Sequence, residues 1–252
     1  MAMIEVKNLK KSFGSFQVLN GLTLSVKKAE TVVILGRSGC GKSVLLKHII
    51  GILRPDAGEV WVNGEKVSHM KEKQLYQAVR NMGMLFQGAA LFDSMTVEEN
   101  TAFYLNQHGH PETGKPLPKS EIRDRVAESL AMVGLENTQK KMPSDLSGGM
   151  RKRAGLARLI VYRPTILLYD EPTTGLDPVT AMQINQLIRK TQEELGATSI
   201  VVTHDICSAL TVSDRLALHA DGHIRHIAEK EEFVQSDDPL IRDFFDQAQP
   251  AK

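Results

Sequence analysis

Apolar and polar residues alternate in the first part of the chain. In "LTLSV" (residues 22–26), every second position is apolar, and a period of two predicts a β-strand with one buried face. The segment "GEVWVNGEKV" has Asn63 and Gly64 between two further strand-like runs. This dipeptide is typical of a two-residue hairpin turn. The sequence therefore predicts an antiparallel β-sheet in the N-terminal part.

Three later segments are apolar without interruption: "TVVIL" (31–35), "TILLYD" (165–170) and "SIVVTH" (199–204). Continuous apolar runs of this length suit central strands of a parallel sheet, which are buried on both faces. Each run leads into a helix-like segment. The repeated order of strand, loop and helix predicts an α/β fold with a mostly parallel core sheet.

Helix boundary signals flank the segment 178–195. Asp177 is an N-cap residue, Pro178 takes the first helical position, and Gly196 stands where the helix is expected to end. These signals predict one long helix.

The pattern between Gln87 and Pro164 is helical. Thr96 and Glu99 have the spacing of a capping box, and apolar residues recur at positions 122, 126 and 130. We interpret residues 88–163 as a helical insertion in the α/β fold.

Composition narrows the class of protein. The 252 residues are 42% hydrophobic and 24% charged, with a formal net charge of +1, which is typical of a globular protein and argues against nucleic acid as a partner. The apolar runs fall far short of the roughly 20 residues that span a bilayer. Cys40 and Cys207 do not have the spacing of a metal-binding or redox-active cysteine pair. We therefore expect the protein to function in a reducing cytoplasm.

The segment "GRSGCGKS" lies between the apolar run 31–35 and a helix-like segment, and it matches the pattern G-x-x-x-x-G-K-[ST]. Its glycines allow backbone N–H groups to surround a phosphate at a helix N-terminus. Lys42 is expected to reach the β- and γ-phosphates, and Ser43 to bind Mg²⁺. The predicted nucleotide-binding residues are Gly36, Arg37, Ser38, Gly39, Cys40, Gly41, Lys42, Ser43 and Val44. We interpret Cys40 as a small filler, because no histidine is adjacent in sequence.

Two carboxylates end the apolar run 165–170. Asp170 is expected to hold Mg²⁺, and Glu171 to polarise an attacking water as a general base. Carboxyl ends of strands are where α/β proteins bind ligands. The alternative interpretation is that Asp170 and Glu171 are two surface carboxylates that cap the strand.

The segment "LSGGM" (146–150) precedes another helix-like run. Ser147 and the backbone N–H groups of Gly148 and Gly149 would form a second anion-binding helix start.

Together these motifs resemble the nucleotide-binding subunits of ABC transporters over nearly the whole chain. They comprise "GRSGCGKS", "TILLYDEP", "LSGGM", Gln87 after "MGMLF", Asp177 in "TGLDP", His204 after "SIVVT", and Phe13. The resemblance implies the P-loop ABC-ATPase fold with a RecA-like core. It implies one domain over residues 1–252: the core in 1–87 and 164–228, a helical subdomain in 88–163, and a C-terminal extension in 229–252.

The resemblance also implies roles within one subunit. Phe13 would stack on adenine, unless it is a core residue. Gln87 would contact Mg²⁺ and the attacking water. His204 would hydrogen-bond the γ-phosphate, unless it is a buried core histidine.

A dimer is a further implication. Ser147, Gly148 and Gly149 would close over ATP held by a second copy, and Asp177 would connect the two sites. The family's usual "LSGGQ" has glutamine where this chain has Met150. This difference removes a polar side chain and leaves the expected Ser147 and backbone contacts in place.

Two features resemble the subgroup that transports phospholipid between bacterial membranes, the Mla type and its chloroplast relatives. The first is "FQGAALFDSMTVEEN" together with "LSGGMRKRAGLAR", and the second is the ending "DDPLIRDFFDQ". This subgroup implies a homodimer, integral membrane permease subunits and a small accessory subunit, at the cytoplasmic face of the bacterial inner membrane. The amphipathic end of the chain would dock on a neighbour or pack on its own domain.

Other functions remain as alternatives. They are transport of an amino acid or another small solute, a soluble ABC ATPase of DNA repair or translation, and a scaffold that binds nucleotide without hydrolysis. The histidines at 219, 223 and 226 are not expected to converge on a metal.

Overall fold

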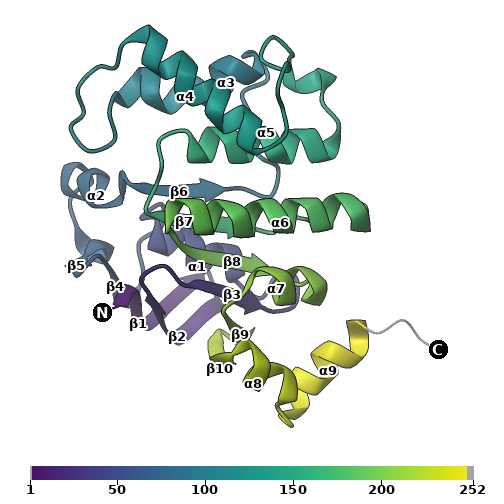
Figure 1. The fold of residues 1–252 in the computed structure, drawn as a ribbon. Coiled ribbons are helices and arrows are strands. Elements are labelled where there is room, and N and C mark those ends of the chain that lie inside the picture. Colours follow the sequence, from purple (N-terminus) through teal and green to yellow (C-terminus); the bar gives the residue numbers. More distant parts are fainter. Residues whose placement is uncertain (1, 249–252) are drawn as a thin grey trace. The chain divides into compact units, whose positions relative to one another are not determined.

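The computed structural model describes residues 2–248, and Figure 1 shows their ribbon. The chain forms two compact units. Unit 1 consists of Met1–Val79 and Thr198–Lys252, and unit 2 consists of Arg80–Ala197. The last four residues of the expected C-terminal extension, 249–252, lie outside the described residues. The domain boundaries expected from the sequence remain a prediction.

An antiparallel sheet forms the N-terminal part of unit 1, in the order β2-β1-β4-β5. Its strands are β1 (Ala2–Phe13), β2 (Phe16–Lys27), β4 (Ala57–Val62) and β5 (Glu65–Lys66). On β2 the apolar positions of residues 22–26 are buried and the polar ones are exposed. Asn63 and Gly64 join β4 to β5 with φ of 51° and 80°. The predicted alternation and hairpin are confirmed.

The second sheet of unit 1 has the order β10-β9-β3-β8. Its strands are β3 (Thr31–Leu35), β8 (Thr198–Thr203), β9 (Arg215–Ala220) and β10 (His223–Glu229). β3 pairs in parallel with β8 and β9, while β10 is antiparallel to β9. Every residue of β3 and β8 is buried, as their continuous apolar sequence predicts.

Unit 1 also contains α-helices and a 3₁₀ helix. They are α1 (Lys42–Ile49), η1 (Val67–His69), α2 (Glu72–Val79), α7 (Ile206–Val212), α8 (Lys230–Gln235) and α9 (Pro239–Ala248). α7 contacts β3 and β8, and α8 contacts β9 and β10. Phe233 on α8 and Ile241 on α9 are buried, whereas Leu240 is 49% exposed. The C-terminal helices therefore pack in part on their own unit.

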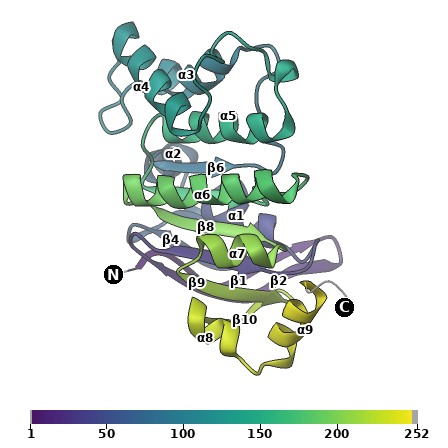
Figure 2. The same ribbon diagram turned by 45° about the vertical axis from the view of Figure 1, so that its right-hand side comes forward.

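Unit 2 contains a parallel strand pair, β6 (Met82–Leu85) and β7 (Ile166–Asp170). Its helices are α3 (Val97–His108), α4 (Lys119–Met132), η2 (Pro143–Asp145), α5 (Gly148–Ile160) and α6 (Pro178–Leu195). Figure 2 shows α3, α4 and α5 grouped together, and each contacts the other two.

The predicted helix signals of unit 2 are confirmed. Thr96 and Glu99 form the capping box of α3, and the apolar positions 122, 126 and 130 of α4 are buried. Asp177 caps α6, and Gly196 ends it with φ of 58°. Within residues 2–248, no helix has the length and apolar character that would allow it to cross a membrane.

Candidate nucleotide-binding site

The glycine-rich loop follows β3 and ends at α1. Gly41 has φ of 106°, and a Cβ atom there would lie 2.6 Å from Val18 Cγ1, so this turn requires glycine. Lys42 is 5% exposed. Its Nζ donates hydrogen bonds to the carbonyls of Gly36 at 2.7 Å and Arg37 at 3.1 Å. The ammonium group is thus held inside the loop.

Other predicted phosphate ligands lie in the same loop and at the start of α1. Ser38 and Gly39 are exposed at the tip of the loop. Ser43 and Val44 lie in the first turn of α1, where backbone N–H groups point toward the helix N-terminus. A helix start beside an ammonium group is suited to bind phosphate oxygens.

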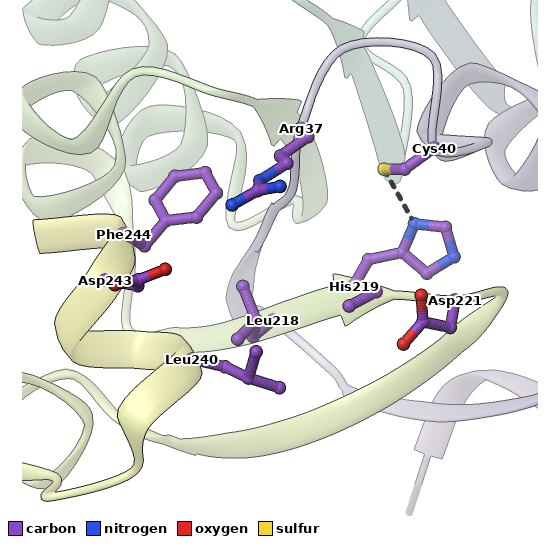
Figure 3. A pocket seen from close by; sticks show the side chains of 9 residues that line it. Arg37, Cys40, Leu218, His219, Asp221, Leu240, Asp243 and Phe244 are labelled. Atoms are coloured by element: carbon purple, nitrogen blue, oxygen red, sulfur yellow. Dashed lines mark hydrogen bonds between the residues drawn. The ribbon is translucent and has the colours of Figure 1, made fainter. Parts of the chain in front are cut away.

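The loop also borders a cavity of ≈ 230 Å³, shown in Figure 3. Its lining residues are Arg37, Cys40, Leu218, His219, Ala220, Asp221, Leu240, Asp243 and Phe244. Cys40 Sγ lies 3.1 Å from His219 Nδ1. Cys40 therefore has a histidine neighbour in space, supplied by β9 from a distant part of the sequence.

His219 is buried in unit 1. Burial, followed by the charge of Lys42, lowers the pKa of His219 from 6.5 to about 4. The imidazole of His219 is therefore neutral near pH 7.

The low pKa of His219 predicts acid sensitivity. A histidine that is buried in its neutral form contributes stability that is complete above pH 6.5 and is lost as the pH falls toward 4. The full loss corresponds to about 3 kcal/mol. We expect the wild-type protein to lose more free energy of unfolding between pH 7 and pH 4.5 than His219→Gln does, as measured by urea unfolding. Equal losses in both proteins would show that this imidazole is not responsible.

His204 and Phe13 also lie in unit 1. Leu35 of β3 pairs with Thr203 of the parallel strand β8, so His204 follows at the same edge of the sheet as the glycine-rich loop. His204 is exposed, and Phe13, at the end of β1, is 48% exposed. Neither residue is a core residue, which removes the alternatives that the sequence had left open. Their expected contacts with nucleotide remain predictions.

The two carboxylates lie in unit 2. Asp170 is the last residue of β7 and Glu171 follows it, and both are buried. Glu171 has φ of 48°, which is unusual for a residue other than glycine. Its Oε2 accepts a hydrogen bond of 3.1 Å from Thr174 Oγ1. The backbone and the side chain of Glu171 are both constrained.

Gln87 is at the same sheet edge as these carboxylates. Leu85 of β6 pairs with Tyr169 of the parallel strand β7, and Gln87 follows two residues later with an exposed side chain. Its carbonyl oxygen accepts a short hydrogen bond from Lys152 Nζ. Unit 2 thus brings together Gln87, Asp170 and Glu171.

Lys152 was not identified as a candidate from the sequence. It is 6% exposed on α5, and its Nζ also lies 3.5 Å from the carbonyl oxygen of Glu171. Burial lowers the pKa of Lys152, and the Asp170 and Glu171 carboxylates partly oppose this shift. Lys152 lies four residues before the buried Leu156 on α5, so both residues share one face of the helix. A lysine at an otherwise apolar helix position could therefore have indicated in the sequence that this side chain is buried.

Ser147 is the N-cap of α5. Its Oγ accepts a hydrogen bond of 3.3 Å from the Met150 N–H, and Gly148 and Gly149 form the first turn. Ser147 itself is exposed. The helix start predicted from "LSGGM" is confirmed.

Asp177 is the N-cap of α6 and accepts a hydrogen bond of 3.0 Å from the Thr180 N–H. Hydrogen bonds from the side chain and backbone of Thr180 lower the pKa of Asp177, so this carboxylate is ionised at neutral pH.

Among residues 2–248, no group of three or more His, Cys, Asp or Glu side chains is arranged to hold a metal ion by itself.

Comparisons with known proteins agree with this arrangement. The family model described as ABC transporter matches residues 19–174. The "Probable ribonucleotide transport ATP-binding protein mkl" of Mycobacterium tuberculosis (strain ATCC 25618 / H37Rv) is 45% identical over 241 residues, which are 96% of this chain and 66% of that protein. The chain thus spans slightly less than two thirds of this relative.

A second relative is matched over most of its length. The "Intermembrane phospholipid transport system ATP-binding protein MlaF" of Haemophilus influenzae is 40% identical over 242 residues, 96% of this chain and 89% of that protein. The ATP-binding cassette MJ0796, solved as a dimer in a post-hydrolysis state with ADP and Pi, has a TM-score of 0.81 and 33% identity, covering 90% of this chain and 99% of that one. The chain belongs to the ABC transporter family.

Proposed function

We propose that this chain is the ATP-hydrolysing subunit of an ABC transporter that moves phospholipid between bacterial membranes. Two copies bind two ATP molecules between them and power a separate membrane permease. The observation that carries the proposal is the loop between β3 and α1, where the buried ammonium group of Lys42 lies at a helix start. This arrangement supports the binding of a nucleoside triphosphate.

The nucleotide is bound by unit 1 in this proposal. Residues 36–44 surround the phosphates with backbone N–H groups, and Lys42 exchanges its hydrogen bonds to loop carbonyls for bonds to the β- and γ-phosphates. The exposed ring of Phe13 stacks on adenine. Arg37 and Cys40 contribute backbone groups and also line the adjoining cavity.

The residues also fit a magnesium ion. Ser43 offers a hydroxyl oxygen, Asp170 a carboxylate and Gln87 an amide oxygen, and Mg²⁺ prefers oxygen ligands of these kinds. A Mg²⁺ ion held by these residues would supply positive charge that offsets the charge of the phosphates. We propose these three residues as its protein ligands.

Hydrolysis requires a positioned water and a proton acceptor. We assign the general base to Glu171, which accepts a proton from the water as its oxygen attacks the γ-phosphorus, and ADP departs as the bond to its bridging oxygen breaks. Gln87 orients the water. Lys42 and His204 donate hydrogen bonds to the γ-phosphate oxygens and stabilise the charge that develops there.

A second copy completes each site. Ser147, Gly148 and Gly149 cover the γ-phosphate of the nucleotide held by the other subunit, and Asp177 connects the two sites across the interface. The dimeric cassette MJ0796 and the exposed, capped start of α5 support this proposal.

We propose the transported substrate and the location from the relative of Haemophilus influenzae, because the match covers 96% of this chain and 89% of that protein. Its printed name refers to intermembrane phospholipid transport. We therefore propose integral membrane permease subunits and a small accessory subunit as partners, peripheral attachment at the cytoplasmic face of the inner membrane, and no nucleic acid. Residues 1–252 form one ABC ATPase domain with the subdomain boundaries expected from the sequence.

A second candidate substrate comes from the mycobacterial relative, whose printed name refers to ribonucleotide transport. Transport of such a solute requires the same ATPase chemistry and a different permease. The two possibilities therefore differ in the partner and in what it carries.

The proposal is tested by isolating the tagged chain from its own membranes in mild detergent. We expect a multi-pass membrane protein and bound phospholipid to copurify with it. After reconstitution into vesicles, the complex should transfer phospholipid with ATP, and the matched complex with Glu171→Gln should not. ATP-dependent transport of a nucleotide without lipid transfer would overturn the lipid assignment, and copurification with ribosomes or DNA would overturn the transport function.

A further inference from the structure

α5 packs against the segment that follows β6. Gly155 makes this close approach possible, because a Cβ atom there would lie 2.9 Å from Leu85 Cδ1 and 3.0 Å from Ala89 Cβ. Lys152 lies one turn before Gly155 and Arg158 lies about one turn after it. The three residues form one stripe along the helix.

The cation at each end of the stripe binds backbone carbonyls. Arg158 donates to Ala90 O at 2.6 Å and to Ala89 O at 3.0 Å. Both alanines have positive φ, 62° at Ala89 and 48° at Ala90, and this conformation is unfavourable for alanine. The guanidinium group therefore stabilises an unusual course of the chain directly after Gln87.

The Lys152 ammonium connects two different strand ends. It donates to the carbonyl of Gln87, which follows β6, and lies 3.5 Å from that of Glu171, which follows β7. A charged donor strengthens hydrogen bonds to neutral carbonyls, and burial strengthens them further. The backbone positions of Gln87 and Glu171 are thus fixed relative to each other by one side chain.

We infer that Lys152 is a positioning residue for ATP hydrolysis, which fixes the backbone of Gln87 and Glu171 so that their side chains address the same water. The inference rests on the proposed function. Lys152 acts through these residues and does not itself contact the nucleotide.

The location of Lys152 on α5 gives the inference a second consequence. Ser147, the proposed contact to the other subunit's ATP, caps the same helix five residues earlier, about 7.5 Å along the axis. A rigid helix therefore joins the end that faces the partner to the backbone of Gln87 and Glu171. Closure of the dimer and alignment of the water would be linked through Lys152.

The test uses the full chain with Lys152→Met, which removes the ammonium group and keeps most of the side-chain length. Arg153→Met is the matched control: it removes a cation from the next position of α5, where Arg153 bonds the side chain of Gln183. We expect Lys152→Met to bind ATP within about twofold of wild type and to lower kcat by about 10–100-fold, since it disturbs an interaction that acts in the chemical step. Arg153→Met should keep both values near wild type.

A double-mutant cycle separates positioning from general structural support. If Lys152 acts through Glu171, adding Lys152→Met to Glu171→Gln should change the residual kcat by less than about threefold, because residues that act as a unit are not additive. Hydrogen exchange should also be faster at the amides of residues 86–92 and 171–175 in Lys152→Met than in Arg153→Met. If Lys152→Met fails to fold, Lys152→Gln replaces it in the same experiments.

The inference is overturned if Lys152→Met keeps the wild-type kcat, or if its effect is fully additive with Glu171→Gln. A wild-type protein without magnesium-dependent ATPase activity would instead contradict the proposed function. The two failures are therefore distinguishable.

Discussion

Glu171→Gln is expected to lower ATP turnover by about 10²–10⁴-fold while ATP still binds, because the amide cannot accept the proton of the attacking water. The substitution preserves the size of the side chain and its capacity to accept the hydrogen bond from Thr174 Oγ1. Steady-state phosphate release measures turnover, and equilibrium binding of a fluorescent ATP analogue measures affinity.

Glu193→Gln is the matched control for this prediction. Glu193 lies on α6 and forms an exposed ion pair with Arg189 at 2.9 Å, an interaction of little energetic value. Its loss should leave turnover unchanged. If Glu171→Gln keeps more than a tenth of the wild-type turnover, Glu171 is not the general base.

Ser147→Arg is expected to abolish hydrolysis and to leave ATP binding by the single subunit largely intact. Ser147 is exposed at the start of α5, so the longer side chain can project away from its own unit. In the proposed dimer it would occupy the place of the other subunit's γ-phosphate and obstruct closure. The measurements are ATPase activity and nucleotide affinity at protein concentrations that favour the monomer.

Ser144→Arg controls for the introduction of an arginine beside α5. Ser144 is exposed on η2, three residues earlier, and no nucleotide contact is proposed for it. It should hydrolyse ATP at the wild-type rate. A sharp loss of ATP affinity in the Ser147→Arg monomer would show that Ser147 belongs to its own subunit's site, and unchanged hydrolysis would remove it from the interface.

Much of the fold could be predicted because local sequence rules and tertiary structure agree. The run 31–35 is apolar throughout and forms a strand that is buried on both faces. Thr96 with Glu99, and Asp177 with Gly196, begin or end helices at the predicted residues. The glycine-rich loop could be identified because it matches a known phosphate-binding pattern. The structure adds a steric reason for one of its glycines, since a Cβ atom at Gly41 would lie 2.6 Å from Val18 Cγ1.

Contacts between distant segments could not be predicted in this way. β9 pairs in parallel with β3 and brings His219 to Cys40, although the residues are far apart in sequence. The sequence alone suggested no histidine partner for this cysteine. Lys152 presents the same difficulty: its position on α5 indicates burial, but its two carbonyl partners depend on how β6 and β7 end.

The pairing of two copies around ATP is tested most directly by sedimentation velocity of Glu171→Gln, which should bind ATP without consuming it. With ATP and Mg²⁺ we expect the protein to sediment as a dimer, and without nucleotide, or with Ser147→Arg added, as a monomer. Sedimentation that does not change with ATP and Mg²⁺, together with no magnesium-dependent ATP binding, would contradict the proposed mechanism.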